Sequence, residues 1–190
     1  VVKFFANPSR TKKRIARFKY LPRNFVPTIL SSGLYTFTYA FEPGSIMSRE
    51  KKAGRVTEIL DHMQDTFWEG KDITAKKISE IVESFYRKKT IARVKQFLLQ
   101  REMLDKPEHI NGVHVPSVLE QLESLDWSIL RNEFKPSSFH GDFHFENILW
   151  QESSSKLVLL DWREDFAGDL EIGDLNYDLA KLLHGLLVSH

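Results

Sequence analysis

Two short apolar runs with a polar turn between them most constrain the fold of this chain. Residues 148–150 read Ile-Leu-Trp, residues 151–156 are polar with three consecutive serines, and residues 157–160 read Leu-Val-Leu-Leu. Apolar runs of strand length on either side of such a turn predict a β-hairpin. The hairpin would fold Asp161 back beside Asn147, so that both polar residues meet at one end of a small sheet.

A third polar residue, Asp142, precedes Asn147 by five positions in the segment His140-Gly141-Asp142. A carboxylate at the first position can orient and deprotonate an attacking hydroxyl. The amide of Asn147 and the carboxylate of Asp161 offer the oxygen ligands that Mg²⁺ prefers beside nucleotide phosphates. Order and spacing of the three side chains therefore indicate kinase-type phosphoryl transfer.

These segments resemble the phosphotransferase family of aminoglycoside kinases and choline/ethanolamine kinases. The resemblance rests on His140-Gly141-Asp142 with Asn147, on Leu160-Asp161-Trp162, and on residues 173–180, which are similar to that family's Gly-Asp…Asp-Leu-Ala signature. It implies a protein-kinase-like fold and ATP- and Mg²⁺-dependent phosphorylation of a hydroxyl on a small molecule. Sugars, amino alcohols and aminoglycosides all remain open as the acceptor.

The resemblance also implies roles for single residues. Asp142 would be the catalytic base, and Asn147 and Asp161 would be the Mg²⁺ ligands. His140 and Asp174 would be structural, the first bracing the catalytic loop and the second capping the next helix.

The N-terminal quarter is similar to the back of a kinase small lobe that runs into the hinge. Its expected elements are a strand, a basic helix capped by Ser9, and two strands, over residues 1–5, 10–20, 26–30 and 34–41. By the resemblance, Lys3 would contact the α- and β-phosphates, and the backbone of Ala40 and Glu42 would bind adenine. We therefore expect an α+β, kinase-like fold, with a partial antiparallel-sheet lobe over residues 1–44 and a mainly helical lobe with the catalytic hairpin over residues 45–190.

Two departures from the family pattern stand in this region. Residues 4–41 contain no acidic residue, although the family pairs its lysine with a glutamate on the following helix. The Gly-rich loop that covers phosphates would precede residue 1, and we expect a fragment with further segments of the same polypeptide at both ends. The departures leave a second hypothesis open, a catalytically weak or silent kinase-like module that serves binding or assembly in a larger protein.

The middle of the chain is predicted to be helical. Apolar residues recur at helical spacing in three stripes, which we interpret as core: Val56 to Phe67 between Arg49 and Trp68, Ile78 to Leu98, and Val118 to Ile129. Residues 105–115 are expected to form a loop. Residues 175–188 are expected to form a last helix with Asp174 as its N-cap.

Composition limits the classes of protein that remain. The chain has 190 residues, is 42% hydrophobic and contains no cysteine, which excludes disulfides and thiolate metal sites. No apolar run is long enough to span a membrane and the N-terminus is no signal peptide, so we expect a cytoplasmic protein with no membrane partner. Residues 1–56 hold 12 Lys/Arg against 2 Asp/Glu, whereas residues 140–190 hold 3 against 10.

Other interpretations of single features are weaker. The triplet His140, Asp142 and His144 lacks the helical i, i+4 presentation usual for a zinc site. The basic segment from Arg10 to Arg23 has the charge density for nucleic acid but no groove-reading motif, so no nucleic-acid partner is expected.

Two further features each have a functional and a structural interpretation. Trp127, Trp162 and Tyr177 could form an aromatic box for a quaternary ammonium group, although each is more often simply packed. The acidic run over residues 164–171 could meet an acceptor or form an exposed loop.

Overall fold

The computed structural model describes residues 1–49 and 54–188 and has an α+β fold of helices and short antiparallel sheets. The chain divides into two compact units, Val1–Asp72 together with Lys135–His190, and Ile73–Phe134. Among the described residues, no helix has the length and apolar character needed to cross a bilayer. The expected lobe boundary at residue 44 stays a prediction.

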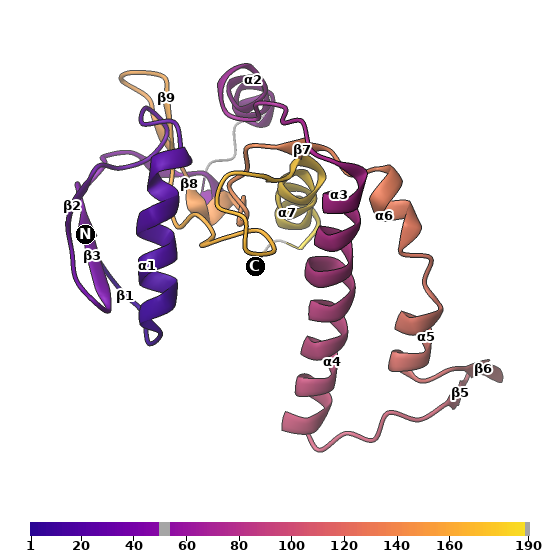
Figure 1. The fold of residues 1–190 in the computed structure, drawn as a ribbon. Coiled ribbons are helices and arrows are strands. Elements are labelled where there is room, and N and C mark those ends of the chain that lie inside the picture. Colours follow the sequence, from indigo (N-terminus) through magenta and orange to yellow (C-terminus); the bar gives the residue numbers. More distant parts are fainter. Residues whose placement is uncertain (50–53, 189–190) are drawn as a thin grey trace. The chain divides into compact units, whose positions relative to one another are not determined.

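The first sheet of the larger unit contains the three strands expected in the N-terminal quarter, although the second lies at Ile29–Ser32 and not over residues 26–30. Its antiparallel order is β1-β3-β2, with bounds Val2–Phe4, Thr36–Tyr39 and Ile29–Ser32. The helix α1 (Pro8–Arg17) continues into the 3₁₀ turn η1 (Phe18–Tyr20) and runs beside this sheet in Figure 1. The N-cap is Asn7 and not Ser9, because the Asn7 side chain accepts a hydrogen bond from the Ser9 amide and Pro8 fills the first helical position.

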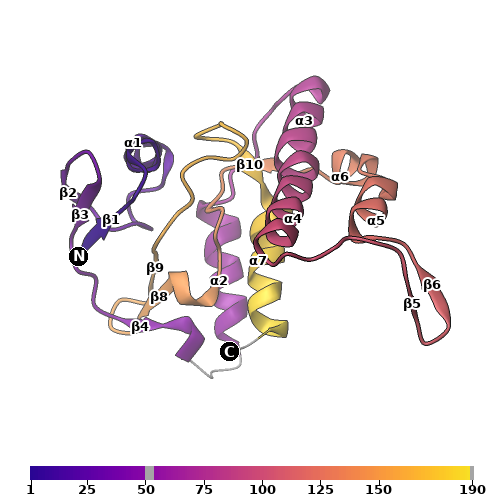
Figure 2. The same cartoon turned by 90° about the horizontal axis from the view of Figure 1, so that it is seen from below.

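The second sheet confirms the predicted hairpin. β8 (Ile148–Gln151) pairs with β9 (Lys156–Leu159), and β4 (Ser45–Ile46) pairs with the other edge of β8 (Figure 2). The Leu160 amide donates to the Asn147 carbonyl over 2.8 Å, so the chain just before residue 161 lies against residue 147. The remaining elements of this unit have the bounds Met47–Arg49 (η2), Arg55–Thr66 (α2), Pro136–Ser137 (β7), Phe145–Asn147 (η4), Gly173–Asp174 (β10) and Leu175–Leu187 (α7).

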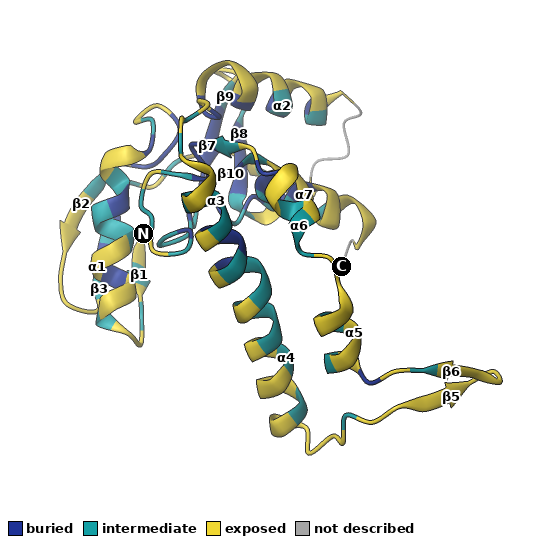
Figure 3. Cartoon of the chain, turned by 45° about the vertical axis from the view of Figure 1, so that its right-hand side comes forward, coloured by how far each residue is buried: buried dark blue, intermediate teal, exposed yellow. Residues whose placement is uncertain are grey.

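The core of this unit joins α2, the hairpin and α7. Ile59 and Met63 of α2, Trp150 of β8 and Leu182 of α7 are all buried in one apolar cluster. The first predicted stripe is therefore core, although residues 50–53 of the expected helix lie outside the described residues. Figure 3 shows the buried stretches of the hairpin in dark blue. Because both apolar runs are locked into this core, the residues at their ends have a rigid support.

The smaller unit consists of helices and one hairpin. Its elements are α3 (Ala75–Ile81), the π-helix η3 (Val82–Lys88), α4 (Lys89–Gln100), β5 (Glu108–Ile110), β6 (Val113–Val115), α5 (Val118–Ser124) and α6 (Ser128–Asn132).

Three expectations for this unit are wrong. The stripe from Ile78 to Leu98 is core only in its first half, because Ile81, Val82 and Phe85 are buried whereas α4 has no buried residue and Phe97 is 51% exposed.

The loop expected over residues 105–115 contains the β5–β6 hairpin, whose turn residues Asn111 and Gly112 both have positive φ. Asn-Gly is the preferred dipeptide for such a turn. The third helix is split in two, and Leu125 and Ile129 are more than half exposed and not core. The split falls where the Asp126 carboxylate accepts from the Ser128 amide, a local bond that competes with helix continuation.

Candidate active site

The backbone of the loop before Asn147 is held by Asp178 of α7. Both Asp178 carboxylate oxygens accept at 2.7 Å, one from the His140 amide and one from the Gly141 amide, and the Trp68 indole adds a third bond at 3.1 Å. Asp178 is fully buried, and burial raises its pKa while the three donors favour the carboxylate form. Asp178 belongs to the segment 173–180 quoted for the family resemblance, but the sequence did not show which groups it would bind.

His140 links this loop to the end of the hairpin. Its Nε2 lies 2.9 Å from the Leu160 carbonyl, and its Nδ1 accepts from the Asp142 amide at 3.3 Å. Burial, reinforced by the nearby charge of Arg17, lowers the pKa of His140 to about 3. The ring is therefore neutral, with its proton on Nε2, and its contacts match the structural role expected for it.

Gly141 is required by the shape of the loop. Its φ is +84°, and a Cβ placed there would lie 2.5 Å from the Cβ of Arg163. A side chain at this position would therefore be strained and would also displace the chain that follows the hairpin.

Asp142 is surrounded by donors. Its Oδ1 lies 3.0 Å from His144 Nε2 and 3.2 Å from Lys181 Nζ, while its Oδ2 accepts a longer bond, 3.3 Å, from the Asn147 amide. Partial burial acts to raise the pKa of Asp142, but Lys181 and His144 oppose it, and the pKa ends below its usual value. Asp142 is therefore ionised at neutral pH.

Asn147 and Asp161 meet at the end of the hairpin as expected. The Asn147 Nδ2 group donates to the Asp142 carbonyl at 2.8 Å, which leaves Oδ1 as the ligating atom of the amide. Asp161 has a φ of +56°, an uncommon backbone conformation for a residue other than glycine. Such conformations are frequent at functional sites because the surrounding structure holds them in place.

Lys3 of β1 reaches the same place from the first sheet. Its Nζ lies 2.7 Å from Asp161 Oδ2, and both side chains are about one-third exposed, at 29% and 35%. The structure therefore brings together Lys3, Asp142, Asn147 and Asp161 within one compact unit. The lysine that has no acidic partner in residues 4–41 is paired instead with the second candidate metal ligand.

Arg17 is a further site residue that sequence reasoning missed. This arginine of α1 is fully buried and donates to the carbonyls of His140 (3.1 Å), Arg163 (2.6 Å) and Leu170 (3.3 Å), and also to that of Phe139. Burial lowers its pKa to about 9. In sequence it was one of several cations in a basic helix, and nothing distinguished it from its exposed neighbours.

The basic helix and the acidic run meet each other. Arg10 Nε lies 3.0 Å from Glu164, Arg14 is 3.6 Å from Glu164, and Lys13 Nζ is 2.6 Å from Asp165. Neither nucleic-acid binding nor an acceptor contact is needed to account for these charges. They join α1 to the segment that follows Asp161.

The expected adenine-binding segment makes two hydrogen bonds with other parts of the larger unit. The Ala40 amide donates to the Thr28 carbonyl at 3.1 Å, so the Ala40 group that remains is its carbonyl oxygen. The Glu42 side chain accepts from Gln151 at 3.1 Å, and no bond of the Glu42 amide is among those of the described chain.

The aromatic residues considered as an ammonium box have packing partners within their own units. Trp162 is buried between Phe18 and Phe37, and Tyr177 packs edge-on against Phe166. Trp127 belongs to the smaller unit. Within residues 1–49 and 54–188, no three His, Asp or Glu side chains form a cluster that could hold a metal ion.

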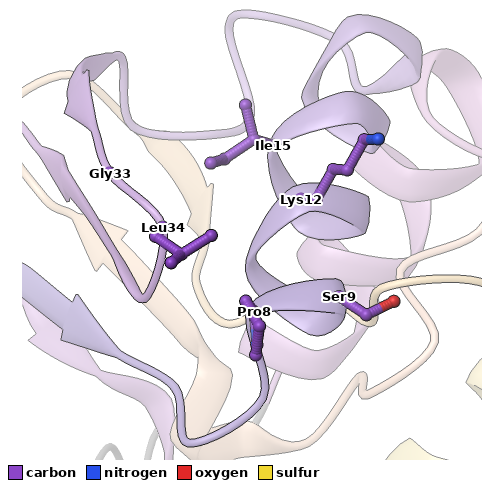
Figure 4. A pocket seen from close by; sticks show the side chains of 6 residues that line it. All are labelled: Pro8, Ser9, Lys12, Ile15, Gly33 and Leu34. Carbon is purple, nitrogen blue, oxygen red and sulfur yellow. The ribbon is translucent and has the colours of Figure 1, made fainter.

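The described residues of the larger unit line at least two cavities. One, of about 300 Å³, opens at Asp142 and Asn147 and is lined by Asp142, His144, Glu146, Asn147, His184, Gly185 and Val188. The other, of about 440 Å³, is a mainly apolar groove between α1 and the β2–β3 turn (Figure 4). None of the expected site residues lines this second groove, so we take the first cavity as the candidate acceptor site.

Comparison with protein families identifies a match. The family model of the phosphotransferase enzyme family matches residues 31–188, which include the catalytic loop, the hairpin and α7. Among curated proteins, none matches the chain.

Proposed function

Because the chain belongs to the phosphotransferase enzyme family, we propose that it transfers the γ-phosphoryl group of ATP to a hydroxyl group of a small molecule. The observation that supports this proposal most is the meeting of Lys3, Asp142, Asn147 and Asp161 at one end of the β8–β9 hairpin. A base, two oxygen ligands and a phosphate-binding cation are the parts that this chemistry requires.

The residues present fit a magnesium ion. Asn147 offers an amide oxygen and Asp161 a carboxylate, and both are the hard oxygen donors that Mg²⁺ selects. Asp161 has a positive φ just beyond the end of β9, so the backbone leaves the regular path of the strand at this residue. Bound there, Mg²⁺ would supply charge neutralisation for the phosphate oxygens.

The reaction would proceed at Asp142. Its carboxylate accepts the hydroxyl proton of the acceptor while a new O–P bond forms to the γ-phosphorus and the bond from that phosphorus to the bridging oxygen of ADP breaks. Lys3 would leave Asp161 for the α- and β-phosphates when nucleotide binds. The Ala40 carbonyl and Glu42 amide would hold the adenine ring.

The cavity beside Asp142 limits the acceptor. At about 300 Å³ it lies at the lower end of the sizes usual for ligand pockets, and its lining contains carboxylate, amide and imidazole groups but no Trp or Tyr ring. We therefore favour a small polyol or amino alcohol over an acceptor of several rings. Cytoplasmic localisation and the absence of a nucleic-acid or membrane partner stay predictions.

Nucleotide binding is testable by thermal unfolding with ATP alone, Mg²⁺ alone, and both together. A ligand at about 100 times its dissociation constant stabilises by roughly 2.7 kcal/mol. For a chain of this length that amounts to a shift of about 5–10 °C. The shift should require ATP and Mg²⁺ together and should disappear in Asp161→Asn.

The matched control is Asp65→Asn, which removes the same charge from an exposed position on α2. It should keep the full shift. ADP release with a hexose, ethanolamine, choline or an aminoglycoside as acceptor would then test transfer. Stabilisation by ATP and Mg²⁺ without transfer to any acceptor would favour the silent module, and no stabilisation in wild type would refute the nucleotide site.

A further inference from the structure

Lys181 of α7 is a charged residue at the candidate site that neither the sequence motifs nor the family match assigns. Its Nζ lies 3.2 Å from Asp142 Oδ1 and 3.2 Å from His144 Nε2, and His144 Nε2 is itself 3.0 Å from the same Oδ1. Three polar atoms from α7 and the catalytic loop thus meet within hydrogen-bond distance of one another.

Only one arrangement of hydrogens gives Oδ1 of Asp142 two hydrogen bonds. Ammonium groups donate only, and an imidazole nitrogen that donates to Asp142 cannot at the same moment accept from Lys181. Lys181 and His144 therefore both donate to Oδ1, and their mutual approach is that of two donors that share one acceptor. Oδ2 has a single, longer bond from Asn147.

The two carboxylate oxygens of Asp142 consequently have different surroundings. Oδ1 is held by two strong donors, whereas Oδ2 keeps lone-pair capacity for one more. Asp142, His144 and Asn147 all line the 300 Å³ cavity. Oδ2 is therefore the oxygen that can accept a proton from a hydroxyl bound in the cavity.

Helix α7 holds the loop at two successive turns. Asp178 binds the amides of His140 and Gly141, and Lys181, three residues later on the same helix face, reaches the side chain of Asp142. His184 and Gly185 follow at the next turn and line the cavity. One face of α7 therefore fixes first the backbone of the loop and then its carboxylate.

Stability does not explain this contact. The side chains of Lys181, Asp142 and His144 are 29%, 38% and 24% exposed. Partly solvated ion pairs of this kind contribute little to the free energy of unfolding. The contact is better explained by the orientation of the carboxylate, because misplaced reacting groups cost large factors in rate.

We propose that Lys181 is a positioning residue for the phosphoryl transfer: together with His144 it holds Oδ1 of Asp142, so that Oδ2 faces the acceptor hydroxyl. This inference rests on the proposed function. Lys181 acts through Asp142, and its effect on the rate should depend on that carboxylate being present.

The test compares Lys181→Met and Lys181→Arg with wild type by ADP release, using Mg²⁺-ATP with ethanolamine, choline, a hexose or an aminoglycoside as acceptor. We expect Lys181→Met to lower kcat by about 100-fold while the KM for ATP changes less than about threefold. Lys181→Arg, which keeps a donor to Oδ1, should recover at least about tenfold of this loss. Lys95→Met, an exposed lysine on α4 of the smaller unit, is the matched control and should leave kcat unchanged.

The Asp142→Asn background separates positioning from direct action on phosphate. There, Lys181→Met should reduce the residual rate by less than about threefold, because residues that act as one unit are not additive. A 100-fold loss in both backgrounds would overturn the proposal, and so would an unchanged kcat in Lys181→Met.

Crystal structures of Lys181→Met and Lys181→Arg without ligands give a second measurement that needs no turnover. The Asp142 carboxylate should turn away from His144 in Lys181→Met and keep its contact in Lys181→Arg. An Asp142 side chain that is unmoved in Lys181→Met would overturn the proposal. If wild type showed no turnover with any acceptor, the proposed function would fail, while these structures would still decide whether Lys181 positions Asp142.

Discussion

Replacing Arg17 by Met should destabilise the larger unit strongly. The guanidinium donates to four carbonyls in two segments: Phe139 and His140 in the catalytic loop, and Arg163 and Leu170 after the hairpin. The side chain is fully buried, and its plane lies over the Phe139 ring with the guanidinium carbon 3.6 Å from the ring centroid. Methionine is similar in length and apolar, so it would fill the space without donating.

The expected loss of stability follows from the carbonyl groups that Arg17 no longer binds. The His140 carbonyl keeps the Arg163 amide as a second donor at 3.0 Å, while the other three carbonyls lose the guanidinium. Each buried acceptor that loses a charged donor costs about 1–3 kcal/mol. Removal of the buried charge also relieves its desolvation, so we expect a net loss of about 3–5 kcal/mol in the free energy of unfolding.

Urea unfolding of wild type, Arg17→Met and Arg17→Lys measures this loss. Lysine keeps a positive charge but cannot reach four carbonyls from one planar group, so Arg17→Lys should still lose about half of that amount. Arg23→Met, an arginine outside α1, is the control for loss of charge and should change stability by less than about 1 kcal/mol. A loss below about 1 kcal/mol in Arg17→Met would refute the reasoning.

Three further outcomes follow from the site. His140 has a pKa of about 3 when folded and 6.5 ordinarily, so the unfolded chain binds a proton that the folded chain rejects. Stability should therefore fall as pH drops from 6.5 towards 3, by up to about 1.4 kcal/mol per pH unit, and urea unfolding of His140→Gln between pH 7 and 4 should lack this slope. Gly141→Ala should lose at least about 1–3 kcal/mol through its positive φ, with a clash against Arg163, which thermal unfolding would detect. Lys3→Met should change stability by less than about 1 kcal/mol, because the Lys3–Asp161 pair is partly exposed, yet it should reduce the thermal shift with Mg²⁺-ATP.

The features that sequence could predict are those encoded by neighbouring residues. The hairpin of β8 and β9 follows from two apolar runs and a serine-rich turn, and the cap of α7 follows from Asp174 directly before the helix. The Asn111-Gly112 turn is encoded locally as well, because Asn-Gly favours a two-residue hairpin turn, but each strand beside it has only three residues and gives a weak pattern.

Contacts between residues far apart in the sequence could not be predicted from neighbouring residues. Nothing local distinguishes Arg17 from Arg14 or Lys13, because its burial depends on carbonyls more than 120 residues later in the chain. The pairing of Lys181 with Asp142 has the same origin, since it requires α7 to pack against the loop. The break at Asp126 has a local cause instead. A hydrogen bond from the Ser128 amide to the Asp126 side chain interrupts the helix that the spacing of apolar residues predicts.

The missing acid on α1 weighs less against activity than the sequence alone suggested. The family's lysine–glutamate pair serves to hold a phosphate-binding lysine and to connect the helix to the site. Here Asp161 pairs with Lys3 only while no nucleotide is bound, but the second task is met by cations of α1: Arg17 binds the loop carbonyls, and Lys13 binds Asp165 beyond the hairpin. An acidic residue on this face of α1 would repel the acidic segment after the hairpin, which α1 must bind. The basic N-terminal and acidic C-terminal parts of the sequence therefore contact each other inside the larger unit, and this contact leaves the candidate site residues assembled.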